Sequence, residues 1–312
     1  MRIAFIGQQD FGKAALEAFL ARGDSVAGVF CKPEKPGEKP DALREAAEKH
    51  GLRVFQFPSL KSEQAEAAMR ELQADIGVMA FVLQFAPQSF VNIPKHGTIQ
   101  YHPSLLPRYR GPSSINWPIA RGDSETGLSI FRPTDGLDEG PVLLQKRCPI
   151  GPDATLGDVY FNALFPMGVA ALLEAADLVV AGKHKEVVQD EAQASYEGWF
   201  KSEESKINWA NHVDQVYNLI RACNPAPGAW CELAGTKVWL YDCRKHTART
   251  FGAVRGKPGE LSAISDNAIF INAQGGMIEV LKLKPEGGKK MGAAEFARER
   301  GLTAVSGGKL AS

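Results

Sequence analysis

Two side chains near the middle of the chain have the types and the placement for acid–base chemistry. His102 ends a short β-favouring run and is followed at once by Pro103, which cannot donate to a sheet ladder. Asp138 lies in the glycine-bracketed sequence DGLDEG, at 135–140, after a second strand-like run at 127–131. Open α/β sheets bind their ligands at strand ends, so this histidine and this aspartate could meet in one crevice.

The residue types alone leave a structural interpretation open. A lone histidine at a strand end is often a satisfied structural residue rather than a catalyst. The sequence DGLDEG could be an ordinary turn, because Asp and Gly dominate turns for steric and hydrogen-bonding reasons. Spacing by itself does not decide between these two interpretations.

The composition indicates a soluble globular protein. The 312 residues are 44% hydrophobic and 23% charged, which suits two domains with a sizeable core. Lys plus Arg and Asp plus Glu both total 36, which disfavours a dedicated nucleic-acid binder but leaves room for a local basic patch. The five cysteines have no CxxC pair and no metal-ligand spacing, so we expect no metal site.

The location is expected to be cytoplasmic, without a membrane span. The first residues, MRIAFIGQQDFG, form a buried strand rather than a charged-then-apolar signal sequence, and the odd cysteine count suits a reducing compartment. The longest apolar run, near 169–181, is interrupted by Glu174 and Asp177.

Strand-like and helix-like patterns alternate in the first part of the chain. Strands are predicted over 2–7, 25–31, 52–57, 75–81 and 98–101, with helices over 11–21, 41–50 and 62–73. This alternation predicts right-handed βαβ units and an α/β, Rossmann-like domain with a mostly parallel sheet. Its first turn has the sequence GQQDFG rather than GxGxxG, so we expect no NAD binding.

The following residues are expected to complete this domain. The pattern predicts one helix and two strands, over 113–121, 129–132 and 142–148. A long apolar helix over 156–181 is interrupted by Pro166 and Gly168 and should kink there, since proline removes an intrahelical hydrogen bond.

A polar stretch at 193–205 is the expected linker, which places the domains at 1–202 and 203–312. After a helix over 211–222, short strands separated by Gly and Pro turns indicate a small C-terminal β-barrel. Those strands are predicted over 229–233, 237–242, 259–262, 268–272 and 277–284.

Two stretches carry a resemblance to a known family. The sequence HPSLLPRYRG at 102–111, followed by DGLDEG, resembles the signature of the formyltransferases that use 10-formyltetrahydrofolate. The run INWANHVDQVYNLIRACNPAPGAW at 207–230 resembles the start of the C-terminal domain that methionyl-tRNA formyltransferase shares with the hydrolase domain of 10-formyltetrahydrofolate dehydrogenase. In the family that domain is an OB-like barrel, and the resemblance implies 10-formyltetrahydrofolate as formyl donor.

The resemblance implies roles for particular residues. We expect Asp138 to pair with His102, to favour the protonated imidazole and to accept a proton from the attacking nucleophile. His102 would then donate to the developing oxyanion. Gln100 stands where formyltransferases acting on amines carry an Asn, and its amide is one methylene longer. The residues expected to bind the folate are Val82, Leu83, Gln84, Phe85, Ser104, Leu105, Asp135, Gly136 and Leu137.

Within the family the chain resembles the hydrolase domain of 10-formyltetrahydrofolate dehydrogenase first and methionyl-tRNA formyltransferase next. Gln100, the YHPS order at 101–104, INW at 115–117 and YEG at 196–198 carry that preference. The loop at 31–40 is shorter and less basic than the tRNA-contacting loop, so tRNA is disfavoured as a partner. Water, a thiol on a separate carrier protein, tRNA and a sugar amine stay open as acceptors, and a binding module without chemistry is the alternative from another class.

Overall fold

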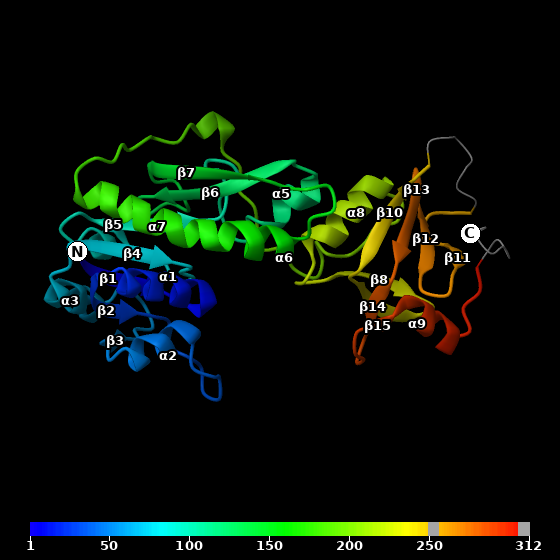
Figure 1. The fold of residues 1–312 in the computed structure, drawn as a ribbon, viewed down its shortest axis with the longest axis horizontal. Coiled ribbons are helices and arrows are strands. Elements are labelled where there is room, and N and C mark those ends of the chain that lie inside the picture. The colour runs from blue at the N-terminus through cyan, green and yellow to red at the C-terminus, as the bar shows by residue number, and fades with distance from the viewer. Residues whose placement is uncertain (249–255, 305–312) are drawn as a thin grey trace. The chain divides into compact units, whose positions relative to one another are not determined.

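The computed structural model describes residues 1–248 and 256–304 of the chain (Figure 1). The residues form two compact units. The first unit comprises Met1–Gly111, Thr126–Pro149 and Phe161–Glu197. The second comprises Pro112–Glu125, Ile150–Tyr160 and Gly198–Ser312, of which the structure describes the ranges given above. The boundary between sequence domains near residue 202 stays a prediction.

The first unit is built on a seven-stranded sheet with the order β3-β2-β1-β4-β5-β6-β7. Neighbouring strands from β3 to β5 are parallel, and β6 is antiparallel to β5. The strands are β1 (Arg2–Gly7), β2 (Ser25–Phe30), β3 (Val54–Phe55), β4 (Ile76–Ala80), β5 (Thr98–His102), β6 (Glu125–Phe131) and β7 (Val142–Pro149). The predicted α/β class and mostly parallel sheet are therefore confirmed.

Helices cover both faces of this sheet, which is why the central strands are apolar without alternation. Every residue of β4 is buried. The helices of this unit are α1 (Gln9–Ala21), α2 (Ala42–Lys49), α3 (Glu63–Leu72), α4 (Gln88–Val91) and α7 (Phe165–Val180), with a short 3₁₀ turn, η2 (Glu191–Gln193). Side-chain caps start two of them, because Asp41 accepts from the Leu43 amide and Ser62 from the Ala65 amide.

The strand order has a switch point next to the strand that carries the candidate histidine. Helices α3 and α4 pack in one core with Ala4 and Ile6 of β1 and Met79 of β4. On the other face, Phe11 of α1 stacks on Tyr101 of β5, with ring centroids 4.3 Å apart. The chain therefore continues from β1 to one face of the sheet and from β4 to the opposite face. At such a point α/β folds bind ligands in a crevice at the carboxyl ends of the two strands.

The long helical stretch Leu156–Val180 differs from the prediction in the position of its interruption. A short helix, α6 (Leu156–Val159), is followed by a π-helical turn, η1 (Tyr160–Leu164), and then by α7. Pro166 lies in the first turn of α7, where its missing N–H has no intrahelical partner to lose. Among the described residues this stretch alone is long and apolar enough to cross a membrane, but α7 buries Leu172, Ala176 and other residues as a core helix does.

The second unit contains two four-stranded antiparallel sheets in the described part of the chain. One has the order β15-β14-β9-β8 and the other β10-β13-β12-β11. The strands are β8 (Ala229–Leu233), β9 (Thr236–Leu240), β10 (Cys243–Thr247), β11 (Leu261–Ile264), β12 (Ile269–Ala273), β13 (Gly276–Val280), β14 (Lys282–Pro285) and β15 (Met291–Gly292). The predicted β-rich domain is confirmed, and closure into a barrel stays a prediction.

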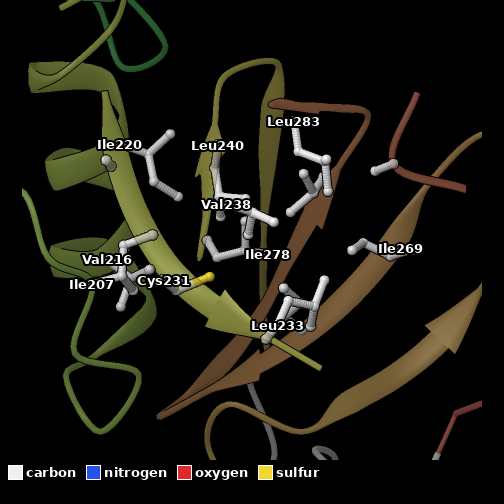
Figure 2. Packing of buried hydrophobic residues seen from close by; sticks show 14 of the residues in the cluster. Ile207, Val216, Ile220, Cys231, Leu233, Val238, Leu240, Ile269, Ile278 and Leu283 are labelled. Carbon is white, nitrogen blue, oxygen red and sulfur yellow. The ribbon is translucent and has the colours of Figure 1, made fainter. Parts of the chain in front are cut away.

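Helix α8 (Val213–Ala222) lies against these strands and helps to form one apolar core. Figure 2 shows Val216 and Ile220 of α8 directed toward the side chains of Val238, Leu240 and Ile278. The unit also contains α5 (Asn116–Arg121) and α9 (Ala293–Glu299). The Asn116 side chain donates to the Ala222 carbonyl, 2.8 Å away, which fixes α5 to the end of α8.

One prediction for this unit is corrected, and some of its elements were not predicted. The single strand predicted over 277–284 is two strands, because the chain leaves one sheet after β13 and joins the other at β14. Between them Leu281 donates to the Asp242 carbonyl, at 2.8 Å. Strand β10 and helix α9 were not predicted.

Substitution of Gly168 tests how closely α7 approaches the sheet. A Cβ at this position would lie 2.5 Å from the Tyr101 ring and 3.1 Å from the Phe11 ring. We expect Gly168→Ala to lower the free energy of unfolding by about 1–3 kcal/mol through overpacking, although alanine is the better helix former. The exposed control Ala170→Gly should cost about 1 kcal/mol from helix propensity alone. Denaturant unfolding followed by circular dichroism measures both, and a Gly168→Ala protein more stable than wild type would contradict the close approach.

Candidate active site

His102 is the last residue of β5 and is almost fully buried, at 6% exposure. Its Nε2 lies 2.8 Å from the Tyr109 carbonyl oxygen. The edge of its ring meets Phe131, the last residue of β6, at a centroid distance of 6.5 Å. Because a carbonyl oxygen only accepts, Nε2 carries the proton in this contact and Nδ1 faces the other way.

The structure brings Asp138 to that second ring nitrogen. Asp138 Oδ2 lies 3.5 Å from His102 Nδ1, and both side chains are at most one-tenth exposed. The same oxygen accepts from the Gly111 amide at 2.8 Å. Asp138 has a left-handed backbone, with φ at +55°, which turns its carboxylate inward from the loop between β6 and β7.

The pairing leaves one carboxylate oxygen without a protein partner. Among residues 1–248 and 256–304, no protein donor bonds Asp138 Oδ1. An ionised carboxylate can accept at both oxygens, so Oδ1 is free to take a proton while Oδ2 stays fixed. The site thus combines a fixed imidazole with a carboxylate that can act as a base.

Gln100 shares a face of β5 with His102, since residues two apart on a strand point the same way. It is partly buried between Met79 of β4 and Phe131 of β6, its register partners. No described residue hydrogen-bonds its side-chain amide. The amide is therefore available on the same side of the sheet as the His–Asp pair.

The loop after His102 uses its polar groups internally. Ser104 is fully buried and its hydroxyl donates to the Arg108 carbonyl, 2.7 Å away. Leu105 packs near Gly127, where a built Cβ would lie 2.6 Å from the leucine side chain. The Leu105 contact holds the loop on β6, and a direct contact of Ser104 with a ligand would require its hydroxyl to leave the Arg108 carbonyl.

The other predicted folate-binding residues lie on two exposed loops. Leu83 and Phe85 follow β4 and are 49% and 48% exposed, and Leu137 of the DGLDEG loop is 54% exposed. Phe81, which was not among the predicted residues, lies beside them and is 38% exposed. Asp135 accepts from the Gln88 amide at 2.9 Å, which ties this loop to the residues after β4. We call Phe81, Leu83, Phe85 and Leu137 the apolar rim.

The remaining candidate folate-binding residues, Val82, Gln84 and Gly136, contribute to the two loops or to the core beneath them. The Gln84 side chain donates to the Phe57 carbonyl at 2.9 Å and so anchors the loop after β4. Val82 is half-buried against the core that contains α3 and α4. Gly136 is half-buried next to Glu139, within the DGLDEG loop.

A buried arginine next to the site was not among the predicted residues. Arg110 is 0% exposed and lies between Tyr109 and Gly111, whose backbone atoms contact the His–Asp pair. Its guanidinium donates to Gln189 Oε1 at 2.9 and 3.1 Å and to both carboxylate oxygens of Glu191 at 2.6 and 2.9 Å. The hydrogen bonds that Arg110 donates to Glu191 raise the pKa of Arg110, so this side chain is permanently charged.

Gln189 connects this arginine to the DGLDEG loop at 135–140. Its amide nitrogen donates to the Asp138 carbonyl at 2.8 Å and to the Gly140 carbonyl at 2.7 Å. One buried side chain thus satisfies the arginine and the backbone on both sides of Glu139. In the sequence, the one indication of this contact is that Arg110 lies inside the HPSLLPRYRG motif. Gln189 lies in a stretch without a recognisable pattern.

The loop at 31–40 is more ordered than its composition predicts. Arg44 and Gln56 each donate to Glu34 Oε2 at 2.8 Å, and the Asp41 amide donates to Oε1 at 3.0 Å. Burial pushes the pKa of Glu34 upward, but these hydrogen bonds outweigh it and bring the pKa to about 2. An acidic residue is thus built into a loop whose lysines are otherwise solvated.

Two family models cover most of the chain. Residues 1–175 match the model described as Formyl transferase, and residues 200–301 match Formyl transferase, C-terminal domain. The chain therefore belongs to the formyltransferase family, as the resemblance predicted.

Relatives extend this assignment. The chain is 38% identical over 308 residues to mitochondrial 10-formyltetrahydrofolate dehydrogenase of Mus musculus, covering 95% of this chain and 33% of that protein. It is 33% identical over 301 residues to methionyl-tRNA formyltransferase of Geobacter metallireducens, covering 95% of this chain and 94% of that protein. The chain thus spans about a third of the length of the dehydrogenases it matches. HypX from Aquifex aeolicus in complex with tetrahydrofolic acid shares the fold, with a TM-score of 0.65, 20% identity and coverage of 96% of this chain and 47% of that one.

The Arg110–Gln189 contact can be tested without an activity assay. Gln189→Met would leave two buried carbonyls and part of the guanidinium unpaired, which costs about 1–3 kcal/mol for each such group. We expect faster amide hydrogen exchange in peptides that contain Gly111 and residues 135–140. The exposed control Gln193→Met makes the same chemical change nearby. Equal exchange in both variants would mean that Gln189 does not position the loop.

Proposed function

We propose that this protein cleaves 10-formyltetrahydrofolate to tetrahydrofolate and formate, as a hydrolase-like member of its family. The contact between His102 Nδ1 and Asp138 Oδ2, buried at the carboxyl end of β5, is the observation that carries the proposal. An imidazole beside a carboxylate can manage both proton transfers that amide cleavage needs.

The apolar rim supports a flat, largely apolar substrate at this site. Phe81, Leu83, Phe85 and Leu137 expose large side chains on the loops that follow β4 and β6. Small-molecule sites are mostly apolar with a few placed polar groups, and the Asp135 and Gln84 contacts fix these loops. A folate ring system, with its aromatic faces and polar edge, suits such a surface.

The proposed chemistry assigns a proton step to each residue. Water attacks the formyl carbon while Asp138 Oδ1 accepts its proton, and Gly111 holds the other carboxylate oxygen. His102 then donates to the oxygen that gains charge, for which Nε2 has to leave the Tyr109 carbonyl. As the carbon–nitrogen bond breaks, N10 takes up the proton that Asp138 accepted from water, and the product leaves as formic acid, which ionises to formate. Gln100 lies on the same face as a further donor.

Hydrolysis is preferred to transfer on the basis of Gln100 and of the relatives. Amine formyltransferases carry the shorter Asn at this position, and the glutamine amide reaches a different point. The chain has a higher sequence identity to the dehydrogenase than to the methionyl-tRNA formyltransferase, although its match to the latter covers nearly the whole of that protein. Transfer to tRNA or to a sugar-nucleotide amine is the second candidate, and a folate-binding module without turnover is the third.

Substitution of the pair tests the catalytic assignment. Turnover of 10-formyltetrahydrofolate, followed by absorbance, should fall on the order of 100- to 1,000-fold in His102→Ala and in Asp138→Asn. His50→Ala, at an exposed position after α2, is the matched control and should retain activity. Tetrahydrofolate affinity should change little in all three proteins. Turnover within a few-fold of wild type in either site variant would remove that residue from the mechanism.

The acceptor is tested by the same assay with and without co-substrates. We expect the wild-type protein to release tetrahydrofolate in water alone, because Asp138 Oδ1 has no protein partner to displace before it activates water. Addition of a thiol should raise the rate only if a carrier is the natural acceptor. Efficient formylation of charged initiator tRNA, with no release of formate in its absence, would instead establish a tRNA formyltransferase.

A further inference from the structure

The second unit contains a cavity of about 720 Å³ that has no part in the proposed chemistry. Helix α8, strands β10 and β14 and the segment at 150–155 line it, and all of these belong to the second unit. Five cationic side chains line it against two carboxylates, those of Asp153 and Asp242. The cations are Arg221, Arg244, Lys245, Lys282 and Lys290. Because the whole chain has no net charge, this cavity concentrates positive charge that the total conceals.

Arg221 is the buried cation of this cavity, at 5% exposure. Its guanidinium donates to the carbonyls of Gly151 and Ala154, at 3.2 and 2.7 Å, and to Asn218 at 2.7 Å. These partners are neutral, and no described carboxylate lies within ion-pair distance. Its Nε is buried without any hydrogen-bond partner in the described residues. Burial lowers the pKa of Arg221, and the charges of Tyr217 and Asp153 offset this only in part.

Buried charges in proteins are normally paired, so an unpaired buried guanidinium indicates a missing anion. Asp153 raises the pKa of Arg221 only from beyond ion-pair distance, and no carboxylate of the cavity forms an ion pair with Arg221 among the described residues. Asp153 accepts from the Tyr217 hydroxyl at 2.9 Å, and Asp242 is exposed. Lys245 is already paired with Asp214.

Three further cations are available at the mouth of the cavity. Arg244, Lys282 and Lys290 are exposed, and none has a carboxylate partner among the described residues. Lys290 Nζ lies 3.8 Å from the centre of the Tyr241 ring, which holds it over the cavity edge. The lining thus places one buried cation at depth and three unpaired cations at the entrance.

We propose that this cavity binds the phosphate group of a small molecule. Guanidinium and ammonium groups are the usual partners of phosphate, because they form short charge-assisted hydrogen bonds with its oxygens. The volume lies in the range of small-molecule pockets, and the cations line one concave site rather than a stripe that would follow a nucleic-acid backbone. The proposal does not depend on folate cleavage, which we assign to the first unit.

Titration of the full-length protein with inorganic pyrophosphate tests this directly. Calorimetry at constant ionic strength of about 0.15 M suppresses binding by diffuse surface charge. Lys282→Gln and Lys290→Gln each remove one exposed cation of the cavity and should weaken binding by about tenfold or more. Lys289→Gln is the matched control, since Lys289 is an exposed neighbour of Lys290 that does not line the cavity, and should change affinity less than about twofold. Arg221 is left intact because its hydrogen bonds support the fold.

Each outcome bears on the proposal. Saturable binding that the two cavity variants weaken and the control does not would establish the site. Equal weakening in all three variants, or no saturation in the wild-type protein, would overturn it. A second titration uses a single-stranded RNA oligonucleotide without terminal phosphates. If that RNA binds through Lys282 and Lys290 while pyrophosphate does not, the cations belong to a nucleic-acid surface and the proposal is wrong.

Discussion

The geometry of the candidate active site depends on one buried arginine. Arg110 has no exposed surface, and its hydrogen bonds to Gln189, Glu191 and Tyr196 join the loop after β5 to the segment before the end of the first unit. The residues on either side of it contact His102 and Asp138 through backbone atoms. A rigid, permanently charged side chain therefore fixes the two contacts that orient the pair. The Glu191 carboxylate is largely exposed, so its ion pair with Arg110 stabilises the fold less than the short distance between the two groups suggests. The buried Gln189 is therefore the more important partner of Arg110.

The sequence predicts the first unit well for a physical reason. Its central strands are covered on both faces, so they are continuous apolar runs bounded by polar turns, and such runs are visible without any knowledge of their neighbours. Strand β10 was not predicted because four of its five residues are exposed, and a polar edge strand has no hydrophobic periodicity in its sequence. The break between β13 and β14 was not predicted for a different reason. A strand that passes from one sheet to another keeps its apolar alternation, and only the pairing partners reveal the change.

The sequence predicted that His102 and Asp138 lie close together, which depends on the backbone, but it missed contacts that depend on tertiary structure. Pro103 and the glycines around Asp138 marked strand ends, and strand ends of one sheet lie close together. The use of the Ser104 hydroxyl could not be predicted, because its type is equally suited to a ligand and to the Arg108 carbonyl. Gln189 was beyond sequence reasoning, since its partner Arg110 is 79 residues away and its other contacts are backbone carbonyls, which carry no side-chain signal.

Backbone strain gathers on the loops that surround the pair. Phe81, Tyr109 and Asp138 follow β4, β5 and β6, and all three have the left-handed backbone that costs about 1–3 kcal/mol for such residues. Tyr109 is held from both sides, because its amide donates to Ser195 Oγ at 2.8 Å while its carbonyl accepts from His102. Under the proposed mechanism His102 gives up that carbonyl to reach the substrate. Ser195 keeps the strained residue in place when this happens, so the imidazole can exchange its partner without movement of the loop that also carries Arg110 and Gly111.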